Sequence, residues 1–407
     1  MTFPRVPLRR IARLVNGGTP TADKANWDGD VLWATPVDLG RADLGLVTTT
    51  ERSLTSSGAR FGSALVPPGS VLVSTRAPIG YVARATTQLA FNQGCKALVP
   101  DNDLVDSQFL AYWLFASRLD LQSRGTGSTF MELGNEQLLG FRIPVPGLDR
   151  QRRIAEFLDD QVARIDMLTA SRQAQLDRLD ETLMATRAQF FERTLAEAPR
   201  RSLRSLCPFF TDGDWIESPY ITDEGIRLIQ TGNVGVGVFK GDSQRYISAE
   251  TFHALRCTAV YPDDVLISRL SPPVARSCIA PELGVPAIAS VDVVIARPAE
   301  DVVDRRYLVE YLSSPRHLSD CDIRARGATM LRLSRSQVGA LRIPVPELSI
   351  QRAAVGELSA LRTELNALSS VIAESKSRLE ELKSSLITAA VMGEFHVTTA
   401  ANQQVAS

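Results

Sequence analysis

The sequence predicts an α+β protein built from two similar modules, each followed by a long helix. Three observations lead to this prediction. A proline-containing segment occurs twice, 200 residues apart. A sustained apolar heptad pattern follows each copy. Before each copy, short β-rich runs separated by Gly and Pro precede a helical pattern, which is typical of an α+β module.

The repeated segment marks where a module ends and a helix begins. Residues 142–152 read Arg-Ile-Pro-Val-Pro-Gly-Leu-Asp-Arg-Gln-Arg and residues 342–352 read Arg-Ile-Pro-Val-Pro-Glu-Leu-Ser-Ile-Gln-Arg, with eight identities in eleven positions. Proline lacks a backbone donor and holds the preceding residue extended, so each proline pair should end a strand before the helix starts. The repeat divides the 407 residues into two similar halves.

Each predicted helix carries residues at alternating spacings of four and three that indicate a coiled-coil seam. The first seam runs through Leu158, Val162, Ile165, Thr169, Arg172, Leu176, Leu179, Leu183, Thr186 and Phe190. The second runs through Leu358, Leu361, Leu365, Leu368, Ile372, Ser375, Leu379, Leu382, Leu386 and Ala389. At 1.5 Å per residue each helix should reach ~60 Å.

The two helices are expected to pair in antiparallel fashion. A parallel pair would force the chain to return ~60 Å between them, whereas a module of ~150 residues has a radius of gyration of only about 15 Å. The prediction is two mixed α/β modules separated by an antiparallel coiled coil, with a pseudo-two-fold internal repeat. The expected segments are module 1 at 1–148, a spacer helix at 149–196, module 2 at 197–348, a second spacer helix at 349–395 and a flexible tail at 396–407.

Within module 1, β-rich runs precede a capped helix. The runs are 31–34, 65–66, 71–73 and 80–83. Asp106 and Ser107 can cap a helix whose apolar face includes Phe109 and Trp113. Module 2 repeats this pattern at both ends, with Asp304 as the corresponding cap, but residues 213–216 and 228–233 have only loose counterparts in module 1. The frame is therefore expected to be shared and the central surfaces to differ.

The composition gives a net charge of −1, but 40 of the 45 basic residues are arginine, because lysine occurs only at 24, 96, 240, 376 and 383. Six arginines lie between positions 316 and 342, against only Asp320 and Asp322. Arginine's planar fork suits phosphate and guanine edges. A GC-rich genome would explain the overall ratio but not this local cluster.

The five cysteines are widely separated and the three histidines do not stand near them at ligand spacing, which argues against a disulfide framework and against a metal site. No apolar run approaches the ~20 residues that cross a bilayer, and the first fifteen residues lack the apolar core of a signal peptide. We therefore expect a cytoplasmic protein without a membrane partner.

Motifs for catalysis or cofactor binding are missing from the sequence. Residues 232–237 read Gly-Asn-Val-Gly-Val-Gly, the reverse of the dinucleotide fingerprint, and Ser271-Pro-Pro-Val274 lacks the aromatic residue with which amino-methyltransferases hold a flipped base. No phosphate-binding loop, nucleophile elbow or zinc-protease motif occurs. We predict a non-catalytic chain without a cofactor.

The sequence resembles the specificity subunits of type I restriction-modification systems. The similarity is carried by residues 65–80 (Leu-Val-Pro-Pro-Gly-Ser-Val-Leu-Val-Ser-Thr-Arg-Ala-Pro-Ile-Gly), by Phe91-Asn-Gln-Gly94, by both copies of the repeat, and by 386–394. The resemblance implies two target recognition domains, each reading one half of a split double-stranded DNA sequence. It also implies that the helices set the spacer and bind two methyltransferase subunits, and that restriction or translocase subunits join the complex. Readers on one DNA face should lie about one helical turn, ~34 Å, or a multiple of it, apart.

Candidate DNA-binding residues lie in turns and loops of both modules. Arg76 and Arg269 stand at corresponding turns, while Asn92 and Gln93 either contact adenine edges or satisfy their own turn's backbone. Phosphate contacts are predicted in the loops that contain Arg124, Thr129, Arg324, Arg326 and Thr329. Trp27 and Trp215 are interpreted as core or shape elements, because a duplex offers no free base face.

On the helices, the seam leucines are expected to pair with each other, so a partner protein must use other positions. The candidates are Met167, Met184, Phe191 and Val391. Two rival interpretations remain. One is a coiled-coil scaffold that binds proteins alone, without salt-dependent DNA binding. The other is a fused restriction enzyme, which would need a methyltransferase or nuclease motif.

Overall fold

The computed structural model describes residues 4–76, 78–127, 131–194, 198–326 and 331–394. The chain forms two compact units, one of Met1–Gln173 with Glu374–Ser407 and the other of Ala174–Ala373. Each unit contains one module and one end of each long helix, so each is described by itself. Within the described ranges, no helix combines the length and apolar character needed to cross a bilayer.

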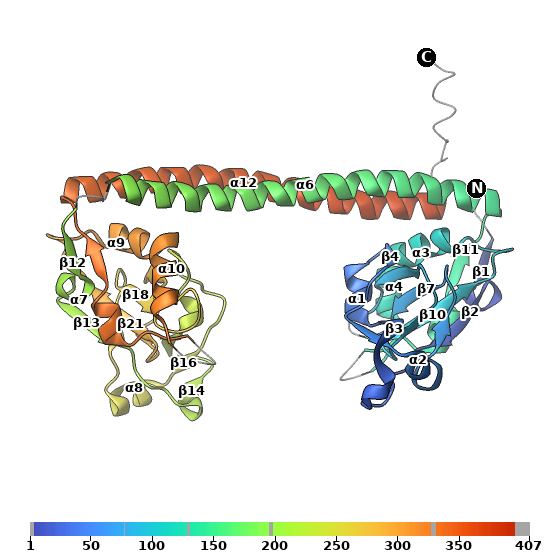
Figure 1. The fold of residues 1–407 in the computed structure, drawn as a ribbon, viewed down its shortest axis with the longest axis horizontal. Coiled ribbons are helices and arrows are strands. Elements are labelled where there is room, and N and C mark those ends of the chain that lie inside the picture. Colours follow the sequence, from blue (N-terminus) through green and yellow to red (C-terminus); the bar gives the residue numbers. More distant parts are fainter. Residues whose placement is uncertain (1–3, 77, 128–130, 195–197, 327–330, 395–407) are drawn as a thin grey trace, which may run out of the picture. The chain divides into compact units, whose positions relative to one another are not determined.

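Module 1 contains two mixed-strand sheets and a small two-stranded one (Figure 1). Its strands are β1 Arg5–Pro7, β2 Ala12–Asn16, β3 Trp27–Ala34, β4 Leu46–Val47, β5 Arg52–Leu54, β6 Leu65–Val66, β7 Val71–Ser74, β8 Val82–Ala85, β9 Leu89–Phe91, β10 Cys95–Pro100 and β11 Arg142–Pro144. The sheets have the orders β2-β10-β7-β8-β4, β5-β3-β9-β6 and β1-β11. The four predicted β-rich runs fall in β3, β6, β7 and β8, in part or whole.

The short helices of module 1 pack against both of its mixed sheets. They are η1 Leu8–Arg10, η2 Lys24–Asn26, α1 Pro36–Arg41, α2 Ser56–Gly62, α3 Ser107–Ala116, α4 Arg118–Ser123 and α5 Asn135–Leu139. As predicted, Asp106 caps α3, because its carboxylate accepts from the amides of Gln108 and Phe109. Phe109 and Trp113 of α3 are buried with strand residues such as Val71 and Leu98.

Module 2 repeats the central strand order of module 1, including the middle region where the sequences match poorly, but differs at the sheet edges: β4 has no counterpart, and the other sheet gains one strand. Its strands are β12 Arg200–Ser202, β13 Phe209–Asp212, β14 Ile221–Thr222, β15 Ile226–Ile229, β16 Tyr246–Ile247, β17 Ala259–Val260, β18 Val265–Ser268, β19 Ser277–Ile279, β20 Ala287–Ala289, β21 Val293–Arg297 and β22 Arg342–Pro344. The order β13-β21-β18-β19 repeats β2-β10-β7-β8, and the parallel pair β15–β20 repeats β3–β9. The duplication therefore extends through the whole module.

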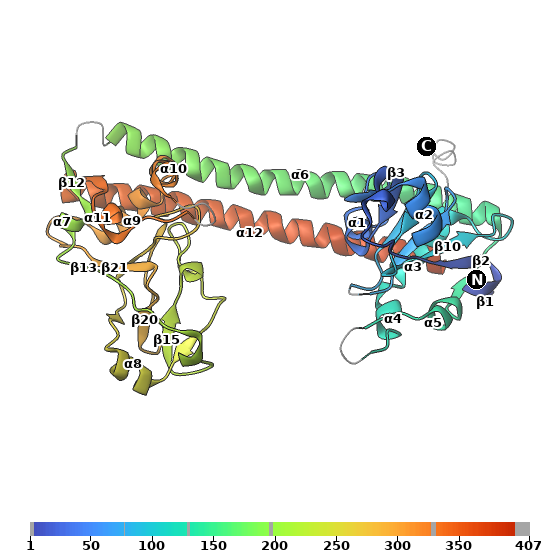
Figure 2. The same cartoon turned by 60° about the horizontal axis from the view of Figure 1, so that its bottom comes forward.

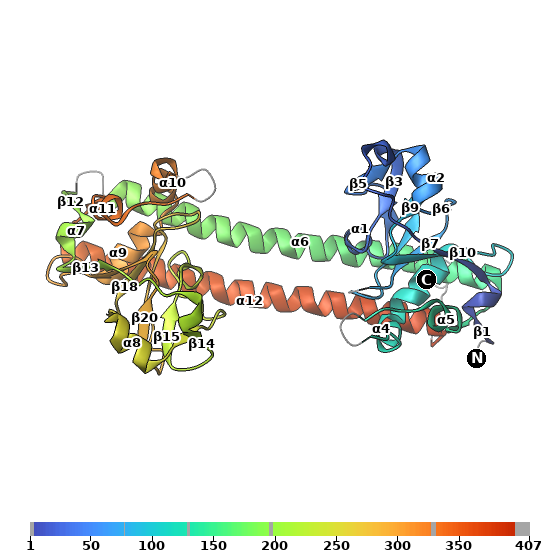
Figure 3. The ribbon, with the colours of Figure 1, turned by 90° about the horizontal axis from the view of Figure 1, so that it is seen from below.

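The helices of module 2 take the same places. They are α7 Leu203–Leu206, η3 Ser218–Tyr220, η4 Thr231–Asn233, α8 Ala249–Leu255, α9 Arg305–Leu312, α10 Pro315–Arg324 and α11 Arg335–Gly339. Asp304 caps α9 as Asp106 caps α3. Figure 3 shows α2 beside β3 and β9 in one module and α8 near β15 and β20 in the other.

The long helices are α6 Leu148–Thr194 and α12 Leu348–Met392, and they pack together in each unit (Figures 1 and 2). Lys383 donates to Asp166 at 2.7 Å and Lys376 donates to Gln173 at 2.9 Å. From Asp166 to Gln173 the chain advances by seven residues along α6, while the bonded residue on α12 goes back by seven, from Lys383 to Lys376. The two helices therefore run antiparallel. The predicted antiparallel pairing is confirmed.

The predicted seam is correct for α6 and partly wrong for α12. All ten predicted positions of α6 are buried or half-buried. On α12, however, Leu368 and Leu382 are 47% and 53% exposed. The inward positions of α12 are those that lie 200 residues after the inward positions of α6, and they include Ser369, Lys376 and Lys383. The lysines fit there because their aliphatic stems cover the seam while their ammonium groups reach acceptors on α6.

A buried glutamine joins each long helix to its module. The Gln151 side chain accepts from the Asp106 amide at 2.9 Å and donates to the carbonyls of Leu104 and Pro146. Gln351 makes the same three bonds, to the amide of Asp304 and to the carbonyls of Val302 and Pro346. Both side chains are fully buried. The repeated Gln-Arg of the sequence therefore fixes the first turn of each helix against a module.

Module 2 is also attached to the helices by a buried ion triad. Glu310 of α9 pairs with Arg187 of α6 at 2.9 Å and with Arg362 of α12. Arg187 also donates to the Ser313 carbonyl. Burial lowers the pKa of Arg187, which Glu310 opposes. One carboxylate thus contacts both long helices in this unit.

Module 1 replaces that triad with apolar packing and a neutral donor. Tyr112, which follows its helix cap at the same spacing as Glu310, donates to Asp159 of α6 at 2.6 Å. The positions that correspond to Arg187 and Arg362 are Ile387 and Val162, and both are buried. The two modules therefore use different chemistry to hold equivalent helix ends.

Replacing Glu310 by Ala should destabilise unit 2 by ~3–5 kcal/mol, because Arg187 would stay buried without a counter-charge. The matched control introduces the module 1 residues, Arg187→Ile, Glu310→Tyr and Arg362→Val, and should recover much of that loss. Hydrogen exchange of the α9 amides measures the stability lost in Glu310→Ala and the stability recovered in the triple variant. Unchanged protection of α9 in Glu310→Ala would contradict the role of the triad.

Replacing Gln351 by Leu should cost ~2–4 kcal/mol, because three buried backbone groups lose their partners. Gln151→Leu should have a similar effect on unit 1. Gln189→Leu, at an exposed position of α6, is the control and should change stability by less than ~0.5 kcal/mol. Denaturant unfolding of the full chain compares the three variants. Equal midpoints would show that the glutamine bonds contribute little.

Candidate nucleic-acid interface

In module 1, the loops that follow β2, β7 and β9 meet the segment that follows α4 at one edge, which we call rim 1: residues 17–19, 75–76, 92–94 and 124–132, of which 128–130 lie outside the described residues. The Thr75 amide donates to Gly94 at 2.8 Å and the Leu133 amide donates to Thr75 at 2.9 Å. Arg76 and Glu132 form a β-bridge. Sequence positions that are far apart are thereby placed side by side on a fixed backbone.

The frame of the rim requires a glycine at its first loop in both modules. A Cβ on Gly17 would lie 2.1 Å from the Asn92 carbonyl oxygen, and one on Gly213 would lie 2.3 Å from that of Ala289. Neither neighbour can move easily, because both carbonyls belong to the backbone of the adjoining strand or loop. The close approach holds the first loop against the loop that follows β9 or β20.

The predicted residues of rim 1 have different surroundings. Arg76 is about half-exposed and pairs with Glu132 at 3.1 Å. Gln93 is exposed and accepts from the Thr19 hydroxyl. The Asn92 carboxamide oxygen accepts from the Gly94 amide at 3.0 Å, the local turn bond that was the alternative for this residue. Arg124 is exposed, with its guanidinium 4.5 Å from the Phe141 ring centroid.

Module 2 contains a matching edge, which we call rim 2: residues 213–215, 269–271, 290–292 and 324–332, of which 327–330 lie outside the described residues. The backbone amide of Arg269 donates to the backbone carbonyl of Asp292 at 2.8 Å, and the amide of Leu333 donates to the carbonyl of Arg269 at 3.0 Å. Thr75 makes the two corresponding backbone bonds in rim 1. The backbones of Arg326 and Arg332 form an antiparallel β-bridge. Arg324 and Arg326 are exposed.

Arg269, predicted to contact DNA, is instead an internal residue that is 4% exposed. Its guanidinium contacts Asp212 at 3.1 Å and Asp292 at 3.4 Å, and it donates to the carbonyls of Leu333 and Val291. Burial lowers its pKa, and the two carboxylates oppose this. We therefore leave Arg269 out of the contact surface. Thr129 and Thr329 lie outside the described residues.

Two arginines that were not singled out from the sequence lie at rim 2, Arg332 within it and Arg335 just after it in α11. Arg332 is half-exposed and pairs with Asp292 at 2.7 Å, and Arg335 lies 3.8 Å from Asp212. Both belong to the arginine-rich segment 316–342, so the cluster was the available signal. Position 132 of rim 1 is a glutamate where position 332 of rim 2 is an arginine. The two rims therefore share a backbone frame and present different charges.

The four predicted partner-binding residues of the helices divide into two groups. Met167 and Met184 are exposed at 69% and 37%. Phe191 and Val391 are buried at 7% and 0%, so their predicted exposure to a partner is wrong in this structure. Phe191 packs edge-on against Tyr307 and Tyr311 of module 2, and Val391 belongs to the module 1 core. Other exposed apolar residues on the two long helices, not predicted as partner contacts, are Leu168, Ile350, Leu368, Val371 and Leu382.

Comparisons with known proteins find a shared fold over the chain and a family match over its first part. Residues 5–178 match the family described as the type I restriction modification DNA specificity domain. A solved structure from a study of complex assembly in a type I restriction-modification system covers 97% of this chain and 98% of its own, with a TM-score of 0.72 and 18% identity. Residues 5–178 are therefore similar to the DNA specificity domain of type I restriction-modification systems. The structural similarity by itself shows a shared fold.

Curated members of the specificity family match over part of the chain. The type I restriction enzyme MjaIX specificity subunit of Methanocaldococcus jannaschii is 36% identical over 156 residues, which are 37% of this chain and 36% of that protein. The EcoR124I/EcoR124II specificity subunit of Escherichia coli is 28% identical over 173 residues, or 40% and 41%. The chain thus spans about two fifths of the length of these relatives. Rim 1 lies inside the family match, and rim 2 is related to it by the internal repeat.

Among the described residues, no group of three or more His, Cys, Asp or Glu side chains is arranged to hold a metal ion. The five cysteines are all buried thiols, and burial raises the pKa of Cys207, Cys278 and Cys321 to about 12. These thiols stay protonated at neutral pH and pack as small apolar groups.

Arg269→Ala should destabilise module 2 by ~3 kcal/mol, because two carboxylates would lose a buried partner. Arg332→Ala, which removes a half-exposed arginine from the same network, should cost less than ~1 kcal/mol. Thermal unfolding of the two variants tests the distinction between a structural and a surface arginine. Equal losses would mean that the network acts as one unit.

Proposed function

We propose that this chain is the DNA specificity subunit of a type I restriction-modification complex, with rim 1 and rim 2 each reading one half of a split duplex target. The observation that carries the proposal is the pair of rims, which repeat one backbone frame but carry different side chains. The match of residues 5–178 to the type I DNA specificity domain supports it. In this proposal residues 1–148 and 197–348 are the target recognition domains, and 149–196 and 349–395 are the spacer helices.

The contacts on each rim are assigned by exposure. Arg76 and Gln93 of rim 1 and Arg332 of rim 2 are the candidates for base edges, since an arginine can bond guanine through two donors. Arg124, Arg324 and Arg326 are the candidates for phosphates, which position a protein on the duplex. The carboxylates of Glu132 and Asp292 hold Arg76 and Arg332 in place before DNA binds.

The helices carry the proposed protein contacts. The exposed residues Met167 and Met184, with the exposed leucines of α12, are the surface for two methyltransferase subunits. Restriction or translocase subunits join through that complex. Methylation and cleavage belong to those partners, the chain itself needs no cofactor, and the assembly works in the cytoplasm. These assignments rest on the family resemblance together with the apolar exposure of the helices.

Footprinting of the chain with its methyltransferase partner should show two protected tracts separated by an unprotected gap. Arg76→Gln should weaken one tract and Arg332→Gln the other, each by ~1–3 kcal/mol, because each change removes a two-donor contact. Arg306→Gln, an exposed arginine of α9 outside both rims, is the control. One continuous tract, or equal loss in both tracts from either rim variant, would contradict the two-reader arrangement.

Salt dependence separates DNA reading from a protein-only coiled-coil scaffold. Binding through phosphates should weaken steeply as salt rises, with a smaller slope in Arg324→Gln and Arg326→Gln. A scaffold would show no salt-dependent DNA binding at all. Mapping of methylated adenines in the host genome then gives the two half-sites directly.

A further inference from the structure

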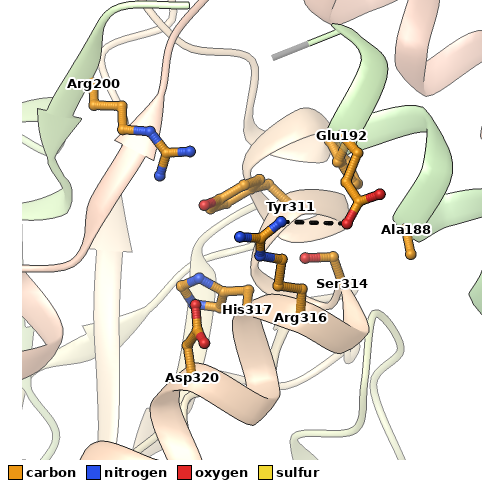
Figure 4. Close-up of a pocket in the computed structure, with 9 residues that line it drawn as sticks. Ala188, Glu192, Arg200, Tyr311, Ser314, Arg316, His317 and Asp320 are labelled. Atoms are coloured by element: carbon orange, nitrogen blue, oxygen red, sulfur yellow. Dashed lines mark hydrogen bonds and ion pairs between the residues drawn. The ribbon is translucent and has the colours of Figure 1, made fainter. Parts of the chain in front are cut away.

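A cavity of about 440 Å³ lies in unit 2, where the last described turns of α6 meet β12, α9 and the start of α10 (Figure 4). Its walls include Phe191, Arg200, Tyr311, Ser314 and His317. The rim 2 arginines Arg324 and Arg326 lie at and beyond the other end of α10, so the cavity is separate from the candidate nucleic-acid interface.

The N-terminus of α10 opens into this cavity without a cap. Ser314 stands at the cap position, but α10 has no side-chain cap bond. The first backbone hydrogen bond of the helix runs from the Leu318 amide to the Ser314 carbonyl at 3.0 Å. The amides of Arg316 and His317 are therefore left without a helical acceptor. A helix start with free amides favours an anion.

The Ser314 side chain is a second, independent indication of a ligand. This residue is only 3% exposed, and within the described parts of the chain its hydroxyl has no hydrogen-bond partner. Figure 4 shows the hydroxyl directed into the cavity. The Ser314 hydroxyl is therefore placed to form a hydrogen bond with a group that enters the cavity.

Of the two arginines that line the cavity, Arg316 has a carboxylate partner and Arg200 contacts the Tyr311 hydroxyl. Arg316 pairs with Glu192 at 3.3 Å, which neutralises both. Arg200 of β12 is exposed, and its guanidinium is directed towards the cavity near Tyr311. Burial lowers the pKa of His317 to about 4, so this ring is neutral. Asp320 beside it is an acceptor for a hydroxyl donor of a ligand.

Aromatic rings form the remaining wall. The Tyr311 ring lies 5.6 Å from Phe191 and 5.1 Å from His317, measured between ring centroids. In module 1 the corresponding positions are filled differently, with Trp113 in place of Tyr311 and Met392 in place of Glu192. Arg5, the counterpart of Arg200, contacts the Met392 sulfur at 3.9 Å. Module 1 shares the uncapped helix start, since Ser117 at the start of α4 is buried and makes no cap bond, so the features that belong to module 2 are the exposed Arg200 and the tyrosine wall.

We propose that this cavity binds a phosphate monoester of nucleotide size. The phosphate group accepts from the amides of Arg316 and His317 and from the Ser314 hydroxyl, and it pairs with Arg200. The body of the ligand packs against Tyr311, and a hydroxyl of the ligand donates to Asp320. Because the walls come from α6, β12 and α10, an occupied cavity holds the end of α6 against module 2.

The test is calorimetric titration of the full chain with adenosine monophosphate, inorganic phosphate and adenosine. The nucleotide should bind, inorganic phosphate should bind more weakly at the same place, and adenosine, which lacks the phosphate, should not bind. Hydrogen exchange with the nucleotide present should slow at 186–192 and 314–318. Absence of binding by both phosphate-containing probes at millimolar concentration would overturn the proposal.

Variants place the binding in this cavity. Arg200→Gln and Ser314→Ala should each weaken binding, the former by about tenfold through loss of a charge-assisted contact. Arg306→Gln on α9 and Arg332→Gln on rim 2 should leave the affinity unchanged, provided that thermal unfolding shows all four variants folded. Equal affinity of Arg200→Gln and Arg306→Gln would refute the site. The DNA footprint should not change in Arg200→Gln, so this proposal and the proposed function fail separately.

Discussion

Two buried glutamines, Gln151 and Gln351, fix the rest of the structure. Each places its carboxamide between the first turn of a long helix, the cap of a module helix and the proline strand, and each satisfies three backbone groups that cannot reach water. The direction in which a long helix leaves its module is therefore set by hydrogen bonds of fixed geometry. The proline pairs that precede the glutamines end the strand at the same point in both copies.

The same frame supports surfaces of different charge. Backbone bonds hold the loops of both rims in the same arrangement, so side chains can change without moving the loops. Rim 1 pairs Arg76 with Glu132, whereas rim 2 holds a buried Arg269 between Asp212 and Asp292 and uses those carboxylates to place exposed arginines. Similarly, the helix ends are held by apolar side chains in module 1 and by an ion triad in module 2. After the duplication, the side chains of the two modules have diverged more than the backbone arrangement that holds them.

Local patterns in the sequence were enough to predict the repeat, the capped helices, the α6 seam and the antiparallel pairing. They failed where long-range packing decides. Leu368 and Leu382 fit a heptad by spacing, but lysine stems take the inward positions instead. Phe191 and Val391 lie off the seam and were interpreted as free, although module side chains cover them. Arg269 stands at a turn, and nothing in its neighbours reveals two aspartates from distant strands.

The interleaving of the units constrains how the protein is made. Ile387, Ala390 and Val391 are fully buried in the core of module 1, yet the ribosome adds them after all of module 2. Until they emerge, the apolar face formed by α3 and the start of α6 stays uncovered during translation, which favours binding by chaperones or aggregation. Module 2 needs only segments already synthesised, apart from the short stretch 348–373 that directly follows it. Module 1, although translated first, is completed last.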